Sequence, residues 1–179
     1  GGKPVTMSDS SGFIHDPEGI DRAKLAWIMD LKNNRRGRIS EYAAEYSSAT
    51  FTPSAPEPSS NGLWGVNVDV ALPCATQNEV NGAEAQMLVD NNVMAVAEGA
   101  NMPCTPEAVE VFQKNGIMFA PGKASNAGGV ATSGLEMSQN SLRYGWTREE
   151  VDAKLDNIMV NIHKNAAETA EKYGRPGDY

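Results

Sequence analysis

The regular alternation of short apolar segments with helix-forming segments constrains the fold of this chain most strongly. Three apolar stretches of strand length occupy residues 66–74, 93–101 and 117–122, and each contains a proline or glycine close to its end. The segments between them, residues 81–92 and 105–116, have helical character, and the second begins with a threonine followed by proline. Such alternation produces parallel sheets with right-handed crossovers. We therefore expect an α/β fold with a Rossmann-like, doubly wound and mostly parallel sheet.

The flanking segments extend this pattern. Residues 4–9 predict a short buried strand and residues 10–19 the connection after it, with a helix starting at Asp16-Pro17-Glu18 and a second helix after Gly37. Residues 52–65 contain three prolines and two glycines, which predicts a surface loop. Long helices should fill residues 123–173, the last of them opened by a capping box between Thr147 and Glu150.

Composition narrows the classes of function. At 179 residues the chain has the length of one domain, and its net charge of −8 argues against electrostatic binding to nucleic acid or to an anionic membrane. No apolar run reaches the roughly 18 residues of a membrane span, so we expect a cytoplasmic protein. Cys74 and Cys104 are too few for a disulfide framework and are expected to be buried thiols, and His15 and His163 lie outside any metal-ligand pattern. No metal site is expected.

Small and polar residues follow each expected strand. Ligands of open parallel sheets bind beyond the carboxyl ends of the strands. The four ends here read SDSSG, PCATQNE, EGANMP and APGKASNAGG. Taken singly, each has the composition of an ordinary turn. Together they predict one polar crevice.

Asp9 ends the first expected strand, where a dinucleotide-binding fold places the acidic residue that meets the adenosine ribose. No glycine-rich phosphate loop precedes it, so we expect the chain to begin inside a mononucleotide-binding half, without its first strand. Ser10 follows Asp9, and the segment LKNNRRGR supplies Lys32 and Arg35 in an otherwise acidic chain. These cations would offset the carboxylate beside a 2′-phosphate, or they would simply form the solvated end of a helix. The residues leave both interpretations open.

A glycine pair interrupts a segment that otherwise predicts a helix. Gly128 and Gly129 are adjacent, and each interior helical glycine costs about 1 kcal/mol relative to alanine. Without side chains, the helix can approach a ligand or a neighbouring domain closely. Tight packing against another helix is the alternative explanation.

Long, ordered segments resemble the cofactor-binding domain of the hexameric, bacterial-type NADP-dependent glutamate dehydrogenases. They read DVALPCATQNEV, VAEGANMPCTPEA, MFAPGKASNAGGVATSGLEMSQNS and VDAKLDNIMVNIH. The resemblance implies reversible, NADP-dependent oxidative deamination of L-glutamate to 2-oxoglutarate and ammonia, in a homo-oligomer of six chains. Residues 1–179 would form a partial dinucleotide-binding domain. The catalytic lysine and aspartate of the family lie in an N-terminal domain, so no catalytic residue is expected in this chain.

The resemblance also implies roles for particular residues. Asn101, in the GAN motif, would lie by the nicotinamide and its ribose, together with the strand end that holds Ala75, Thr76 and Gln77. Ser133 would donate a hydrogen bond to a substrate carboxylate, and Val130 would pack on the substrate side chain. The positions associated with the adenosine 2′-phosphate are Asp9, Ser10, Lys32 and Arg35.

Two other functions stay open at this point. The 179 residues alone would form a non-catalytic module that binds a nucleotide weakly or not at all, because the pyrophosphate normally rests on a glycine-rich turn. Alternatively, the substrate is a branched-chain or aromatic amino acid, since related dehydrogenases share this architecture.

Overall fold

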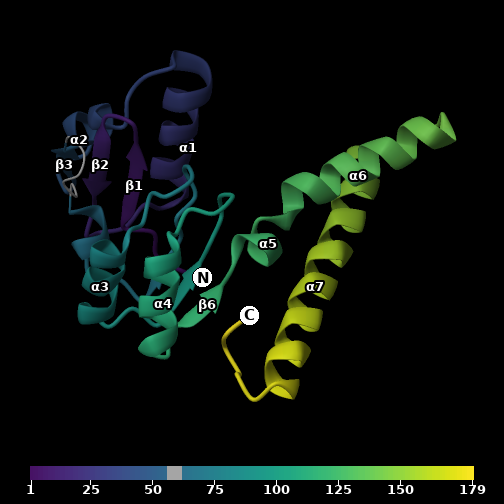
Figure 1. The fold of residues 1–179 in the computed structure, drawn as a ribbon. Helices are drawn as coiled ribbons and strands as arrows, with labels where there is room; N and C mark the ends of the chain where they lie inside the picture. Colours follow the sequence, from purple (N-terminus) through teal and green to yellow (C-terminus); the bar gives the residue numbers. More distant parts are fainter. Residues whose placement is uncertain (56–61) are drawn as a thin grey trace. The chain divides into compact units, whose positions relative to one another are not determined.

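The computed structural model describes residues 1–55 and 62–179 and divides into two compact units, Gly1–Val66 and Asn67–Tyr179 (Figure 1). The strands of the two units form two separate sheets. An antiparallel sheet belongs to the first unit and a parallel sheet to the second. Each unit is described by itself below.

The first unit packs two helices against a three-stranded antiparallel sheet of order β1-β2-β3. Its strands are β1 (Thr6–Asp9), β2 (Gly12–His15) and β3 (Thr50–Pro53), and its helical segments are α1 (Arg22–Asp30), the π-helical turn η1 (Leu31–Arg35) and α2 (Ser40–Glu45). Apolar residues from all of these layers meet in one core that includes Ile14, Ile20, Ile28, Ile39 and Tyr42. The helix expected after Gly37 is confirmed.

Three expectations for this unit are wrong. Residues 10–19 are not a simple connection, because Gly12–His15 form strand β2 and bury Phe13 and Ile14. Gly12 has a φ of 149° and lies so close to β3 that a Cβ there would overlap the Thr52 carbonyl oxygen. As a result the first strand is half-buried and pairs antiparallel with β2.

The first helix begins at Arg22, capped by the Asp21 side chain, and not at residues 16–18. Asp16 is buried, and one of its carboxylate oxygens accepts hydrogen bonds from the Tyr42 hydroxyl and the Lys24 ammonium group. The other oxygen accepts the Glu18 backbone N–H at 3.1 Å, so Asp16 holds the turn that precedes the helix. The loop expected over residues 52–65 lies partly outside the described residues, namely at 56–61. The described remainder includes the end of β3 and a 3₁₀ turn at Leu63–Gly65.

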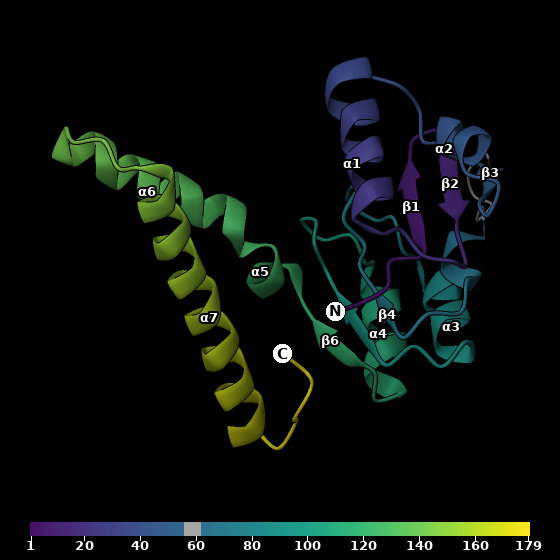
Figure 2. The ribbon, with the colours of Figure 1, turned by 180° about the vertical axis from the view of Figure 1, so that it is seen from behind.

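The second unit contains the predicted parallel sheet. Its strands β4 (Val70–Ala71), β5 (Ala95–Ala97) and β6 (Met118–Ala120) run in the order β4-β5-β6, connected through α3 (Gly82–Asp90) and α4 (Pro106–Lys114). Both helices lie on the same face of the sheet (Figure 2). The Phe112 ring of α4 stacks on the Phe119 ring of β6 with centroids 5.8 Å apart, and Val96 between the outer strands is also buried. The strand-helix alternation and the Thr105 cap are confirmed.

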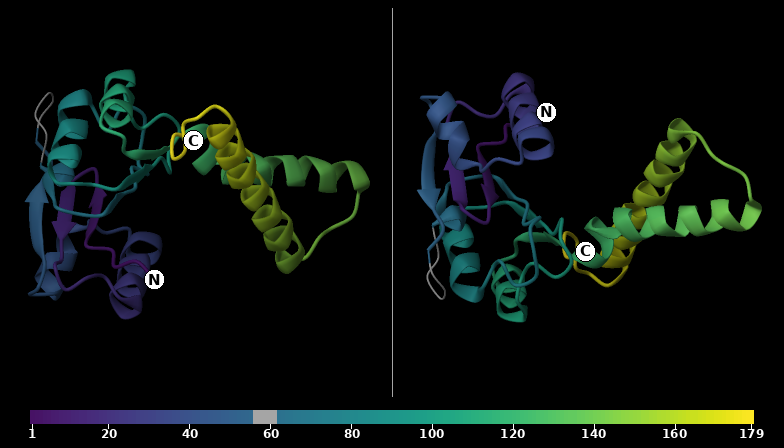
Figure 3. Two further views of the ribbon diagram at one scale, coloured as in Figure 1. Left: turned by 90° about the horizontal axis from the view of Figure 1, so that it is seen from below. Right: turned by 90° about the horizontal axis from the view of Figure 1, so that it is seen from above.

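The expected long helices follow the sheet as α6 (Ala127–Leu142) and α7 (Arg148–Lys172), and the short helix α5 (Gly122–Ser125) precedes them. Helix α6 ends at Arg143 in the left-handed region, and α7 begins with the predicted Thr147–Glu150 capping box. From there α7 returns toward α5, which it contacts (Figure 3). Among the described residues, no helix combines the length and the apolar character that crossing a membrane requires.

Candidate functional site

Asp9 is the centre of a hydrogen-bonded cluster in the first unit. One carboxylate oxygen accepts from the Lys32 ammonium group at 2.7 Å and from the Ile39 backbone N–H at 2.9 Å. The other accepts from the Ser11 backbone N–H at 2.9 Å and from the Ser11 hydroxyl at 2.6 Å. The β1 end, the η1 turn and the start of α2 therefore converge on a single carboxylate.

The pKa of Asp9 lies well below its ordinary value. Burial, the largest single influence, raises it, but the bonds from Lys32, Ser11 and the Ile39 N–H together outweigh burial. Asp9 is thus a carboxylate whose charge is matched by Lys32. A phosphate placed beside it would meet less repulsion than an isolated aspartate would exert.

The structure separates the basic residues of the LKNNRRGR segment. Lys32 lies with Asp9, as expected, and the Arg38 guanidinium donates to the Ser10 hydroxyl at 2.8 Å. Arg35 points elsewhere, because its Nε pairs with Asp30 at 2.9 Å and its guanidinium lies 4.5 Å from the Trp27 ring centroid. Arg38 belongs to the same basic segment, but nothing in the sequence distinguishes it from the other arginines there. The geometry of the turn decides which arginine returns to β1.

The ends of β4 and β5 in the second unit carry the next group of predicted residues. The backbone N–H groups of Ala75 and Thr76 both donate to a Glu79 carboxylate oxygen at 3.1 Å, and Gln77 is exposed at the tip of this turn. Burial raises the pKa of Glu79 above its ordinary value, although these N–H groups oppose it. The turn is therefore held by its own carboxylate.

Asn101 lies exposed in the neighbouring turn, which begins at Glu98. Backbone bonds join the two turns: Asn78 N–H donates to the Met102 carbonyl at 3.1 Å and Gly99 N–H donates to the Pro73 carbonyl at 2.9 Å. Three of the four polar strand ends thus belong to one parallel sheet, whereas the sequence predicts that all four do. The fourth, at Asp9, belongs to the antiparallel sheet of the first unit.

The two predicted substrate contacts lie on an exposed face of α6. Val130 is 72% exposed, and Ser133 is exposed with its hydroxyl 3.4 Å from the Gly129 carbonyl oxygen. A Cβ at Gly129 would have no neighbour within 4 Å, and one at Gly128 would only reach the Met159 sulfur at 4.0 Å. Tight helix packing therefore does not explain the glycine pair in this unit.

The two cysteines differ in environment. Cys104 is buried, as expected, but Cys74 is exposed, so the expectation of two buried thiols is wrong for Cys74. Cys74 lies beyond the end of β4, and a Cβ at Gly99 would overlap its sulfur atom. Its position at the rim of the sheet, rather than in the strand, leaves it accessible.

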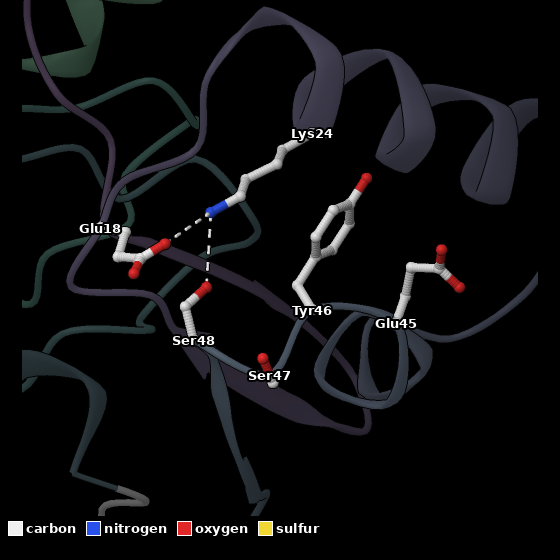
Figure 4. Close-up of a pocket in the computed structure, with 6 residues that line it drawn as sticks. All are labelled: Glu18, Lys24, Glu45, Tyr46, Ser47 and Ser48. Atoms are coloured by element: carbon white, nitrogen blue, oxygen red, sulfur yellow. Dashed lines mark hydrogen bonds and ion pairs between the residues drawn. The ribbon is translucent and has the colours of Figure 1, made fainter.

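A separate hollow of about 420 Å³ lies in the first unit (Figure 4). Its lining residues are all polar or aromatic: Glu18, Lys24, Glu45, Tyr46, Ser47 and Ser48. Lys24 already pairs with the buried Asp16 carboxylate at 2.8 Å. The cation is therefore matched, and the hollow does not present free positive charge to a ligand.

Comparison with known proteins connects this geometry to a family. The sequence profile of the family described as "Glutamate/Leucine/Phenylalanine/Valine dehydrogenase" matches residues 1–177. This chain is a member of that dehydrogenase family. The chain is 58% identical over 178 residues to the NAD(P)-specific glutamate dehydrogenase of Xylanibacter ruminicola, covering 99% of this chain and 38% of that protein. It is 52% identical over 174 residues to the NADP-specific glutamate dehydrogenase of Haemophilus influenzae, covering 97% and 36%.

A solved member of the dehydrogenase family has the same fold. The crystal structure of Plasmodium falciparum glutamate dehydrogenase matches with a TM-score of 0.83 and 46% identity, over 96% of this chain and 36% of that one. The chain thus spans little more than a third of the length of these relatives. The α/β class, with its parallel sheet and long C-terminal helices, agrees with this dehydrogenase structure.

Proposed function

We propose that residues 1–179 form the cofactor-binding part of a glutamate dehydrogenase. In the proposed reaction, L-glutamate, NADP⁺ and water give 2-oxoglutarate, NH₄⁺, NADPH and a proton. The observation that carries this proposal is the 58% and 52% identity to glutamate dehydrogenases over nearly the whole chain. The family description names four amino acids, and the names of these close relatives favour glutamate among them.

The Asp9 cluster is the proposed site of the adenosine 2′-phosphate. Lys32 and the Ser10 hydroxyl supply a cation and a donor, and the Ser11 and Ile39 contacts hold the Asp9 carboxylate in a fixed orientation. The Asp9 cluster, with this cation and these donors, suits a phosphate better than an aspartate without such partners would. Arg35 joins the site in our proposal, but it must first leave Asp30 and Trp27. Arg38, already on Ser10, needs no such movement.

The strand ends of the second unit are the proposed nicotinamide site. The nicotinamide, when bound, accepts the hydride from the α-carbon of glutamate. Asn101 and the 75–77 turn would orient the ring and its ribose, and the joined turns keep these groups at one edge of the sheet. Val130 and Ser133, exposed on α6, would contact the side chain and a carboxylate of the substrate.

We further propose that proton transfer is carried out by a lysine and an aspartate of a longer protein, outside residues 1–179. The full-length protein would act as a hexamer in the cytoplasm. The 179 residues alone would then bind nucleotide weakly or not at all, and would not turn over substrate. We base this assignment on the resemblance and on the fraction of the relatives' length that the chain covers.

The test is the Ser133→Ala variant of the full-length protein. Loss of a hydrogen bond to a substrate carboxylate should raise the KM for glutamate about 10-fold and leave the KM for NADP nearly unchanged. Ser138→Ala is the matched control, since Ser138 is also an exposed serine of α6 whose hydroxyl donates to a carbonyl one turn earlier. Steady-state kinetics with each substrate varied in turn provides both constants.

Two results would contradict the proposal. A wild-type protein that reduces NADP with leucine, phenylalanine or valine but not with glutamate would overturn the substrate. Equal changes in the KM values for glutamate and NADP in Ser133→Ala would contradict the assignment of Ser133 to the substrate site.

A further inference from the structure

Glu98 is a buried carboxylate that the proposed reaction does not use. It follows β5 directly and is only 5% exposed. Its two carboxylate oxygens accept from different segments: the Cys104 backbone N–H at 3.1 Å and the Gly122 backbone N–H at 2.5 Å. Within residues 1–55 and 62–179, no lysine or arginine forms an ion pair with it. Removing a carboxylate from water is costly, and here the two backbone N–H groups offset that cost.

Further contacts tie the same two segments together. The Ser125 hydroxyl donates to the Glu98 carbonyl at 2.6 Å. In the amide orientation that satisfies both of its neighbours, Asn126 donates to the Gly99 carbonyl at 3.1 Å and accepts from the Asn101 N–H at 3.3 Å. A Cβ at Gly122 would lie 2.8 Å from the Ala100 carbonyl oxygen, so the approach of the segments depends on glycine there.

We infer that Glu98 is a positioning residue that fixes Asn101 for the nicotinamide by clamping the 98–104 turn to the segment that leads into α6. This inference rests on the proposed function, which places the nicotinamide at Asn101. The clamp joins the two features that must meet there, because the turn carries Asn101 and the clamped segment leads to Val130 and Ser133.

A carboxylate is required at this position because two N–H donors converge on it. Glutamine keeps the shape of the side chain but presents an NH₂ group to one of the two donors. Glu98→Gln therefore breaks one arm of the clamp and leaves the other intact. The matched control is Glu110→Gln, since Glu110 is an exposed residue of α4 in the same unit that pairs with Lys114 on the same helix.

The first measurement is nucleotide binding to the full-length protein, detected by fluorescence and by calorimetry. Glu98→Gln should raise the Kd of NADPH about 10-fold and leave the Kd of adenosine 2′,5′-bisphosphate, which lacks the nicotinamide, within about 2-fold. Equal weakening of both nucleotides, or no change in either, would overturn the inference. A wild-type protein that does not bind NADPH would overturn the proposed cofactor itself, whereas normal wild-type binding unaltered in Glu98→Gln overturns the role of Glu98 alone.

The second measurement is amide hydrogen exchange of the nucleotide-free protein. Exchange over residues 99–104 and 122–126 should rise about 10-fold in Glu98→Gln and stay unchanged in Glu110→Gln. If Glu98→Gln does not fold, Ser125→Ala is the substitute variant, because it removes a smaller part of the clamp. It should raise the Kd of NADPH about 3-fold and leave the Kd of adenosine 2′,5′-bisphosphate unchanged. Wild-type exchange and wild-type nucleotide binding in Ser125→Ala would then overturn the inference.

Discussion

At the scale of single residues, the half-buried Asp9 and the buried Glu98 show how acidic side chains hold segments of this chain together. Each accepts backbone N–H groups at the end of a strand, and each joins segments that are distant in sequence. They differ in one respect: Asp9 has Lys32 as a counterion. The Asp9 cluster is therefore locally balanced in a chain of net charge −8, which suits a site proposed for phosphate.

Replacing Lys32 tests that role. In the full-length protein, Lys32→Gln should raise the Kd of NADP about 10-fold and change the Kd of NAD by less than about 2-fold, because only NADP carries the 2′-phosphate. Arg35→Gln should have a smaller effect, since Arg35 is held by Asp30 and Trp27. Calorimetric titration with each nucleotide measures both. An unchanged preference in Lys32→Gln would show that Lys32 serves only to balance Asp9.

At the scale of elements, helix α6 combines weak helix-forming residues with an open surface. Gly128, Gly129 and Gly134 interrupt it, and Val130 and Met137 are both more than 70% exposed along it. Close packing does not require glycine at positions 129 and 134, where a Cβ would meet no atom within 4 Å. We attribute these glycines to access for the substrate and cofactor.

The Gly129→Ala variant should therefore change stability and activity in opposite directions. Because a Cβ there meets no atom within 4 Å, alanine should stabilise the chain by about 0.5–1 kcal/mol. In the full-length protein the same change should lower kcat/KM for glutamate, as the added methyl group enters the proposed substrate space. Gly134→Ala, also without a neighbour, is the control for the helix effect. Thermal unfolding and kinetics supply the two readouts, and a destabilised Gly129→Ala would contradict the open environment.

At the scale of the whole molecule, the two units should respond differently to acid. Asp16 in the first unit is fully buried; burial, the largest influence, raises its pKa, but hydrogen bonds from Lys24, Tyr42 and Ser48 lower it to about 2. The pKa of Asp9 in the same unit is also lowered. In the second unit, burial raises the pKa of Glu79.

A carboxyl group with a lowered folded-state pKa stabilises the fold above its ordinary pKa and loses that contribution as the pH falls through the folded value. The first unit should therefore lose stability between about pH 4 and pH 2, ahead of the second unit. Amide NMR signals of residues 1–55 should lose dispersion first as the pH is lowered. Asp16→Asn should destabilise this unit by about 3 kcal/mol at neutral pH, because it leaves Lys24 without its buried partner. Simultaneous loss of both units' signals in the wild type would contradict this order.

Local patterns in the sequence were enough to predict the parallel strands, the crossover helices and the caps at Thr105 and Thr147. Longer ordered segments carried the resemblance to the family. Those features depend on hydrophobic period and on capping residues within a few positions of one another. The sequence offered Lys32 and Arg35 as cations that could offset Asp9 but left a solvated helix end equally open, and the structure pairs Lys32 with Asp9.

Tertiary structure alone decided the contacts between distant segments. It turned residues 12–15 into a strand, made Asp16 a buried hydrogen-bond acceptor, directed Arg38 rather than Arg35 toward Ser10, and placed Glu98 between Cys104 and Gly122. The physical reason is that a charged or polar side chain has the same local pattern whether it is solvated or buried. Only the arrival of donors from other elements determines which of these side chains is buried and which partners satisfy it.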